Sequence, residues 1–425
     1  MLRPRRRWRR WVVAALVLLM LFATRPWWCR GACLAMARYE FSRFDAQRAE
    51  LWLNWSIRLT GEDGETVLWL ARAYRRQGRL EDTRAALERA LRLGAPRERL
   101  ERENWLALAQ SGQIREAEPH LPGLLTRPGN DGPEICEAFA LGYMRSQRHA
   151  QAARLLEAWM NDWPHQARPY LLRGRLYLVQ QQTRKAEADF RKALDRDAGC
   201  AEAAVELADI LRGENRPKEA QPLYERWVHD RRVGTRAKVG LAGCLKALGR
   251  ADEARSWLES ALAAAPHDWT TLLEMGRIEL EAGRYAAAEE FLRRALPLTW
   301  DDEVRYLLAQ ALQGQGKTDE AKPFFEQVRR TRDAFRELQR LEDELVKAPG
   351  DPQLLTQMGA ILLEYADPEE GVLRLLAALD RDPRHREARQ LLVRHYEQRA
   401  LQRPEFQKLA DWHRGFLTQP GPSER

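Results

Sequence analysis

Three consecutive segments of 34 residues decide the fold: ARPYLLRGRLYLVQQQTRKAEADFRKALDRDAGC (167–200), AEAAVELADILRGENRPKEAQPLYERWVHDRRVG (201–234) and TRAKVGLAGCLKALGRADEARSWLESALAAAPHD (235–268). Aligned on one another without gaps, they have small residues at the eighth and the twentieth position. These are Gly174, Ala208 and Ala242 at the eighth position, and Ala186, Ala220 and Ala254 at the twentieth. The segments are therefore repeats of one structural unit.

Larger side chains recur at positions 11 and 24 of the unit. They are Tyr177, Leu211 and Leu245 at position 11, and Phe190, Tyr224 and Leu258 at position 24. With the small residues, they follow the i, i+3, i+4, i+7 spacing of an amphipathic helix in each half of the unit. Small residues are needed where the two helices cross, because overpacking there would cost about 1–3 kcal/mol. The pattern predicts an all-α solenoid of stacked helix pairs.

The same register continues on both sides of these three units. Upstream units lie at 30–63, 64–97, 98–131 and 133–166, and downstream units at 269–301, 302–335 and 352–385. The alternation of small and large residues, with proline at position 32 in Pro164, Pro266 and Pro383, resembles the tetratricopeptide repeat family, and its bacterial membrane-anchored members in particular. The resemblance covers residues 30–400. It implies a right-handed superhelix of about nine helix–turn–helix units behind one N-terminal transmembrane helix.

These features divide the chain into successive segments. They are a basic N-terminus (1–10), a transmembrane signal-anchor (11–28), degenerate N-terminal repeats (29–132), a regular solenoid (133–335), an extended helix or insert (336–351), a C-terminal repeat with capping helices (352–416) and a disordered tail (417–425). Residues 336–351 lie outside the register but favour helix. We expect them to extend the second helix of the preceding unit, and a separate docking helix is the alternative.

Several of the predicted second helices contain a proline. Pro119, Pro222 and Pro323 share position 22 of their units, and we expect them in the first turn or so of the helix, where a missing N–H is tolerated. Pro122 comes a turn later and should disturb its helix. Together with the loop at 126–134, it predicts a hinge.

The N-terminus has the composition of a membrane anchor. Residues 11–24 are uncharged and almost wholly apolar, and six arginines precede them. A helix from Trp8 to Trp28 would span about 31 Å, close to the roughly 30 Å of a bilayer core. The excess of arginines before the apolar run predicts a single-pass anchor with a cytoplasmic N-terminus, and repeats on the periplasmic or outer side. A cleaved signal peptide, which would leave a secreted soluble adaptor, is the alternative.

The basic charge of the chain does not indicate a nucleic-acid-binding surface. The formal net charge is +8, but residues 1–30 alone contain eight arginines and no acidic residue. Residues 31–425 therefore sum to about zero. The basic pI belongs to the N-terminus, so we predict no nucleic-acid partner.

The sequence lacks the motifs of catalytic and cofactor-binding sites. The five cysteines include no CxxC pair, and the eight histidines have no metal-ligand spacing. Gly316, Lys317 and Thr318 fit a loose phosphate-loop pattern, but a helix rather than a strand precedes them, so we interpret them as a turn between two repeat helices. We predict no enzyme activity, no cofactor and no metal.

The remaining candidate site is the surface formed by the first helix of each unit. The resemblance implies that positions 2, 5, 9, 12 and 13 of the unit line a concave face. Those that we predict to form a peptide-binding groove are Arg168, Leu171, Arg175, Arg212, Arg236, Lys246 and Arg277, and the unit at 64–97 adds Arg72, Arg75 and Arg76. Arginines between aliphatic residues suit an extended peptide with acidic groups, because a guanidinium holds a carboxylate with two hydrogen bonds. Solvated arginines of an arginine-rich protein are the alternative interpretation.

The leading hypothesis for function is a membrane-anchored scaffold that binds proteins or peptides in this groove. The resemblance to bacterial anchored repeat proteins supports a second one, an accessory subunit of an envelope-assembly or polysaccharide-export enzyme complex.

Overall fold

The structure, a computed structural model, describes residues 28–42, 45–126, 128–401 and 403–417. All regular secondary structure in these ranges is helical. The chain separates into two compact units, residues 1–200 and 201–425, which are described one at a time. The predicted anchor at 11–28, apart from Trp28, and the tail after Leu417 lie outside the described residues. Among the helices that are described, none combines the length and the apolarity needed to cross a bilayer.

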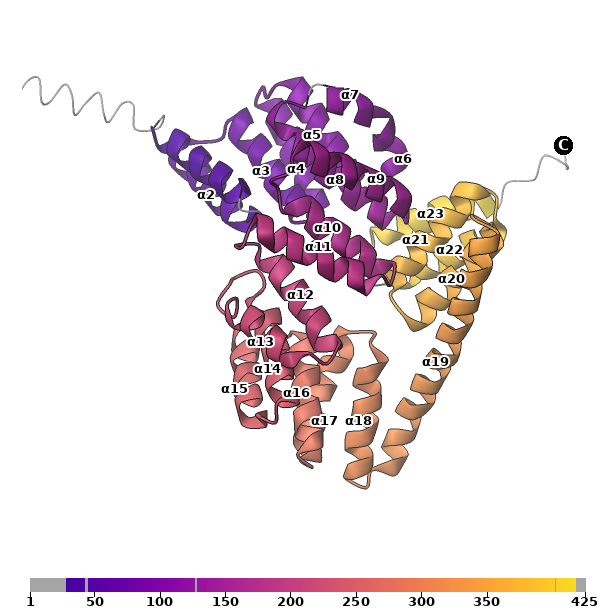
Figure 1. The fold of residues 1–425 in the computed structure, drawn as a ribbon. Coiled ribbons are helices and arrows are strands. Elements are labelled where there is room, and N and C mark those ends of the chain that lie inside the picture. The colour runs from indigo at the N-terminus through magenta and orange to yellow at the C-terminus, as the bar shows by residue number, and fades with distance from the viewer. Residues whose placement is uncertain (1–27, 43–44, 127, 402, 418–425) are drawn as a thin grey trace, which may run out of the picture. The chain divides into compact units, whose positions relative to one another are not determined.

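The first unit consists of antiparallel helix pairs (Figure 1). A helix at 28–42 is followed by α2 (Ala46–Thr60), α3 (Gly64–Arg76), α4 (Leu80–Arg92), α5 (Arg97–Gln110), α8 (Gly132–Arg145), α9 (His149–Asp162), α10 (Arg168–Val179) and α11 (Thr183–Arg196). Each second helix packs on the first helix of its pair, as α4 does on α3 and α11 on α10. First helices also pack on one another, α3 on α5 and α8 on α10.

The second unit continues the pairs with α12 (Ala201–Gly213), α13 (Pro217–Glu225), α14 (Gly234–Ala247), α15 (Ala251–Ala264), α16 (Trp269–Glu281), α17 (Tyr285–Ala295), α18 (Asp302–Gly314), α19 (Thr318–Lys347), α20 (Pro352–Tyr365), α21 (Pro368–Arg381), α22 (Arg386–Ala400) and α23 (Phe406–Leu417). Their first helices again pack on one another, α12 on α14, α14 on α16, α16 on α18, and α20 on α22. The all-helical repeat fold expected from the sequence is confirmed.

The small residues of the repeat lie where the helices of a pair cross. Ala186, Ala208, Ala220 and Ala254 are all inaccessible to solvent. At Gly174, an added Cβ would lie 2.5 Å from the ring of Phe190, the large residue at position 24 of the same unit. The small and large columns of the repeat are therefore the two sides of one contact, as the spacing predicts.

The degenerate repeat at 98–131 has no continuous second helix. In its place are α6 (Ile114–Ala117), a 3-10 turn at Glu118–His120, α7 (Leu121–Thr126) and a second 3-10 turn at Gly129–Asp131. Pro119 lies in the first 3-10 turn and Pro122 in α7. The disturbance predicted from Pro122 is present, whereas hinge motion at this point stays a prediction.

The expected place of the other two prolines is wrong by about one turn. Pro222 and Pro323 each stand inside their helix, as its sixth residue. There the ring removes an N–H that would otherwise bond to the carbonyl four residues earlier. Helix α13 ends three residues after Pro222. Helix α19 continues for 30 residues in all, because its apolar residues beyond Pro323 are held by packing on neighbouring helices.

Residues 336–347 continue α19 without a break, so no separate helix forms there. Leu338 and Leu341 on this extension are almost fully buried against Met358 and Leu362 of α20. The extension therefore carries the chain from α18 to α20 along one straight helix (Figure 1).

The C-terminal helix pair encloses a histidine whose protonation state should affect stability. His413 is 2% exposed, and its ring stacks on Tyr396 at a centroid distance of 5.8 Å. Burial, with the Arg389 guanidinium 3.4 Å from His413 Nδ1, lowers the pKa of His413 to about 4. Both effects disfavour the imidazolium form in the folded protein.

We expect His413 to destabilise the C-terminal helix pair, α22 and α23, at acidic pH. As the pH falls from about 6.5 to about 4, His413 binds a proton in the unfolded state but stays neutral in the folded state. The free energy of unfolding therefore falls by up to roughly 3 kcal/mol. Urea unfolding at pH 7 and pH 5, followed by amide exchange in α23, measures the loss. In His413→Leu the loss over this range should be smaller. An equal loss in both proteins would contradict the assignment.

Candidate functional site

A groove of the second unit lies where the stacking of first helices is interrupted. Among the described residues, α18 and α20 do not pack on one another as the neighbouring first helices do. The extension of α19 separates them, and a cavity of about 890 Å³ opens between α18, α19 and the turn from α20 to α21. We call it the α18–α19 groove. The lining residues are Trp269, Leu298, Thr299, Trp300, Asp301, Asp302, Glu303, Tyr306, Val328, Thr331, Arg332, Phe335, Tyr365, Ala366 and Asp367.

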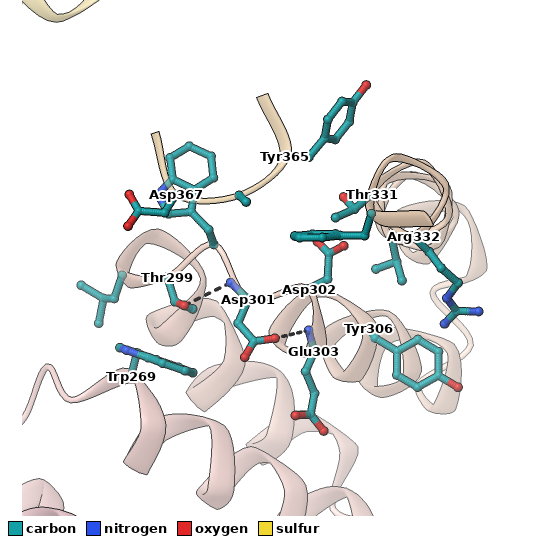
Figure 2. A pocket seen from close by; sticks show the side chains of 15 residues that line it. Trp269, Thr299, Asp301, Asp302, Glu303, Tyr306, Thr331, Arg332, Tyr365 and Asp367 are labelled. Carbon is teal, nitrogen blue, oxygen red and sulfur yellow. Dashed lines mark hydrogen bonds between the residues drawn. The ribbon is translucent and has the colours of Figure 1, made fainter. Parts of the chain in front are cut away.

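Aromatic rings form much of the wall of this groove. Trp300, Tyr306 and Phe335 are 53%, 40% and 42% exposed, although large aromatic side chains are usually well buried in a monomer. Trp269 at the start of α16 and Tyr365 at the end of α20 complete the set, and both are half-buried. Figure 2 shows Trp269 and Tyr365 on opposite sides of the N-terminus of α18.

Four carboxylates share the groove with these rings. Asp301 is the N-cap of α18: its Oδ1 accepts a hydrogen bond from the Glu303 N–H at 2.8 Å, and its own N–H donates to Thr299 Oγ1 at 3.1 Å (Figure 2). Asp367 caps α21 in the same way, its Oδ1 accepting from the Glu369 N–H at 2.9 Å. Both carboxylates are placed by the helices that they start.

The other two carboxylates of the groove are ion-paired. Asp302 Oδ1 lies 3.1 Å from Arg305 Nη1, and Glu303 Oε1 lies 2.6 Å from Arg277 Nη2. Asp301 and Asp367 have no such cation among the described residues. Arg332 is the single basic residue of the lining. The groove is therefore aromatic and acidic.

The basic residues predicted to line a groove are mostly engaged within the chain. The ion pairs join first helices of neighbouring repeats: Arg168 Nε to Glu137 Oε1 at 2.6 Å, Arg236 Nη1 to Glu206 Oε1 at 3.1 Å, Lys246 Nζ to Glu281 Oε1 at 2.9 Å, and Arg277 to Glu303. Arg236 also lies 2.5 Å from Asp209. Arg212 is exposed beside Tyr224 and Asp209, and Arg175 is half-buried with a partner of its own.

Two parts of the predicted surface are corrected. Leu171 is fully buried, so it cannot line an accessible face; its side chain belongs to the core of the first unit. Arg75 is 1% exposed and pairs with both Glu103 and Glu134. Arg72 also pairs with Glu103, and Arg76 also pairs with Glu134. These three arginines connect helices instead of facing a ligand. Peptide binding by the remaining basic positions stays a prediction, although carboxylates already balance most of their charge.

Sequence reasoning missed the α18–α19 groove itself. Two signals point to it in retrospect: Trp300 occupies a position where the repeat usually has proline, and the register breaks by sixteen residues at 336–351. Neither signal shows that α20 stands away from α18, because that depends on the length of α19.

Four models of the tetratricopeptide repeat match the chain, at residues 65–93, 171–234, 235–299 and 279–345. Cellulose synthase operon protein C of Xanthomonas axonopodis pv. citri (strain 306) is 30% identical over 182 residues, 40% of this chain. The chain spans only 12% of the length of that relative.

Three solved structures are similar to parts of the chain at low sequence identity. PilW, described as a widely conserved type IV pilus biogenesis factor, is 23% identical with a TM-score of 0.43, over 46% of this chain and 91% of that chain. Pseudomonas aeruginosa PilF is 17% identical with a TM-score of 0.43, over 47% and 92%. The APC/C hetero-tetramer Cut9-Hcn1 is 14% identical with a TM-score of 0.44, over 86% and 76%. The repeating columns, the helix pairs and the four family matches together show that the chain belongs to the tetratricopeptide repeat family.

Proposed function

We propose that the chain is a tetratricopeptide repeat scaffold without catalytic activity, which binds a polypeptide segment of another protein in the α18–α19 groove. The observation that carries the proposal is the set of exposed rings at the interruption of the helix stack. Tryptophan and tyrosine supply much of the binding energy at protein interfaces, because they bury a large area with few rotatable bonds. A groove of this volume accommodates several side chains of a partner.

Removal of two rings from the groove is expected to weaken binding of the partner at least about tenfold. The variant is Trp300→Ala/Phe335→Ala in the full chain. Its matched control is Trp412→Ala/Phe416→Ala on α23, because those two rings are 56% and 41% exposed. A partner recovered from lysate by the immobilised chain is purified, and its dissociation constant is measured by calorimetry for all three proteins. Equal loss in both variants, or no loss in the first, would count against the groove.

We also propose that residues 11–28 form a single-pass anchor, with residues 1–10 in the cytoplasm and the repeats on the periplasmic or outer side. The first described repeat supports this with an apolar outer stripe on α2. Leu51, Trp55 and Leu59 are spaced four residues apart and are 59%, 55% and 50% exposed, whereas the end of a solenoid is usually polar.

The anchor is tested by alkaline extraction of membranes from cells that make the full chain. If residues 11–28 are an anchor, the protein should stay in the membrane pellet. Mass spectrometry of the mature N-terminus tests the alternative, a secreted adaptor. If the first peptide of the mature protein begins near Cys29, the N-terminal segment is a cleaved signal peptide and the anchor proposal is wrong.

A second candidate function is an accessory subunit of an envelope-assembly or polysaccharide-export complex. The similarity to a protein named for a cellulose synthase operon, over 40% of this chain, favours it. Genes for an envelope-assembly or export enzyme beside this gene, and co-purification of their products with the full chain, would support this role. A neighbourhood without such genes would argue against it.

A further inference from the structure

We infer that the α18–α19 groove selects a cationic segment, with an arginine or lysine side chain of the partner seated among the aromatic rings. The inference rests on the proposed function and specifies the chemistry of the partner. It reverses the polarity expected from the sequence, which is an acidic peptide on basic first helices.

The first argument is the hydrogen bonding of the two helix caps. Asp301 and Asp367 each use Oδ1 to cap a helix. Their Oδ2 atoms accept no hydrogen bond from the residues that the structure describes. Both residues line the cavity. A carboxylate with an unoccupied oxygen at the wall of a groove is a ready acceptor for a guanidinium or an ammonium group.

The second argument is the balance of charge in the lining. The lining contains four carboxylates and one guanidinium, that of Arg332. Two effects oppose the negative potential: Arg277 and Arg305 pair with Glu303 and Asp302, and the N-termini of α18 and α21 carry partial positive charge. At each cap the carboxylate still outweighs its own helix end, which contributes only about half an elementary charge. Among the described residues, Arg332 forms no ion pair with Asp301 or Asp367, so the negative charge at these two positions is local.

The third argument is the aromatic surroundings of these carboxylates. Trp300 directly precedes Asp301, and Tyr306 lies in the second turn of α18, the helix that Asp301 caps. Tyr365 is the last residue of α20, two residues before Asp367. The face of an aromatic ring attracts a cation, most strongly for tryptophan. Rings and carboxylates that line the same groove therefore favour a basic side chain over a purely apolar one. A sugar chain could stack on the same rings, but it would form no ion pair with the Asp301 and Asp367 carboxylates.

The test is fluorescence polarisation with two labelled peptides that share an alternating leucine frame. One has arginine at the intervening positions and the other has glutamate. We expect the full chain to bind the arginine peptide at least about tenfold more tightly than the glutamate peptide, with an affinity that falls as salt is added. Equal binding of the two, or tighter binding of the glutamate peptide, would overturn the inference.

The decisive variant is Asp301→Asn/Asp367→Asn. Asparagine caps a helix as well as aspartate does, so the variant removes charge and keeps the fold. Asp351→Asn is the matched control, because Asp351 also caps a helix through its Oδ1, which accepts from the Gln353 and Leu354 N–H groups at the start of α20, but it does not line the groove. We expect the double variant to bind the arginine peptide roughly tenfold more weakly, and the control to bind it within about twofold of the parent.

The outcomes separate this inference from the proposed function. If Trp300→Ala/Phe335→Ala loses the natural partner while Asp301→Asn/Asp367→Asn keeps it, the groove is the binding site but does not select a cation. If a β-1,4-linked glucose oligosaccharide binds and the arginine peptide does not, the groove is a sugar site and the inference is wrong. If neither pair of substitutions affects the partner, both proposals fail.

Discussion

Arg75→Ala is expected to destabilise the first unit by about 3–5 kcal/mol, because it removes the buried cation that Glu103 and Glu134 share and leaves each of these buried carboxylates with one ion-paired arginine. Arg75 Nε lies 2.5 Å from Glu103 Oε1, its Nη1 donates to Gln110 Oε1 at 2.6 Å, and its Nη2 pairs with Glu134. The side chain thus joins α3 to α5 and α8. Burial alone would raise the pKa of Glu134, but Arg76 and Arg75 hold that pKa well below its usual range.

Arg84→Ala provides the control for this prediction. Arg84 pairs with Glu81 on the exposed face of α4, where the two side chains are 56% and 90% exposed, and pairs of this kind contribute about 0–1 kcal/mol. Urea unfolding, with amide exchange read separately in α3, α5 and α8, compares the two variants. Similar small losses in both would show that the Arg75 contacts do not hold the unit together.

Gly142→Ala should destabilise the same unit by roughly 3 kcal/mol or more, because α8 and α5 touch at this residue. An added Cβ would lie 2.0 Å from the carbonyl oxygen of Ala109 and 2.6 Å from Ile114 Cδ1. A flexible side chain could move aside, but the carbonyl belongs to the backbone of α5, so the two helices must separate. The gain in helix propensity, about 1 kcal/mol, is too small to compensate.

Gly31→Ala is the matched substitution in a helix without a close neighbour. No heavy atom lies within 4 Å of a Cβ built at Gly31, so we expect no loss and a gain of up to about 1 kcal/mol from propensity. Thermal unfolding followed by circular dichroism measures both variants. Stability of Gly142→Ala equal to that of the parent would mean that α5 and α8 are not in this contact.

Much of the fold could be predicted from the sequence because each repeat contains both sides of its own main contact. Gly174 and Phe190 lie sixteen residues apart, and their sizes are complementary. The ion pairs between repeats could not be predicted in the same way. Arg168 and Glu137, or Lys246 and Glu281, come from different units, and their pairing depends on how closely those units stack. The sequence therefore identified cations on the first helices without their partners.

The candidate site shows the same limit more clearly. Trp300, Phe335 and Tyr365 belong to three different helices or turns, and no spacing in the sequence joins them. They share a groove because α19 is long enough to separate α20 from α18. A helix extension is visible in the composition of 336–351, but its geometric effect on the stack follows only from the packing of Leu338 and Leu341 on α20.

Hydrogen–deuterium exchange of the full chain with and without the arginine peptide tests the central claim most directly, because it locates the binding surface. The account predicts slower amide exchange at 298–306 and 365–369, which line or adjoin the groove, and unchanged exchange at 168–178 and 234–247. Protection confined to 168–178 and 234–247 would contradict it, since the peptide would then bind to the first helices that carry the predicted basic residues.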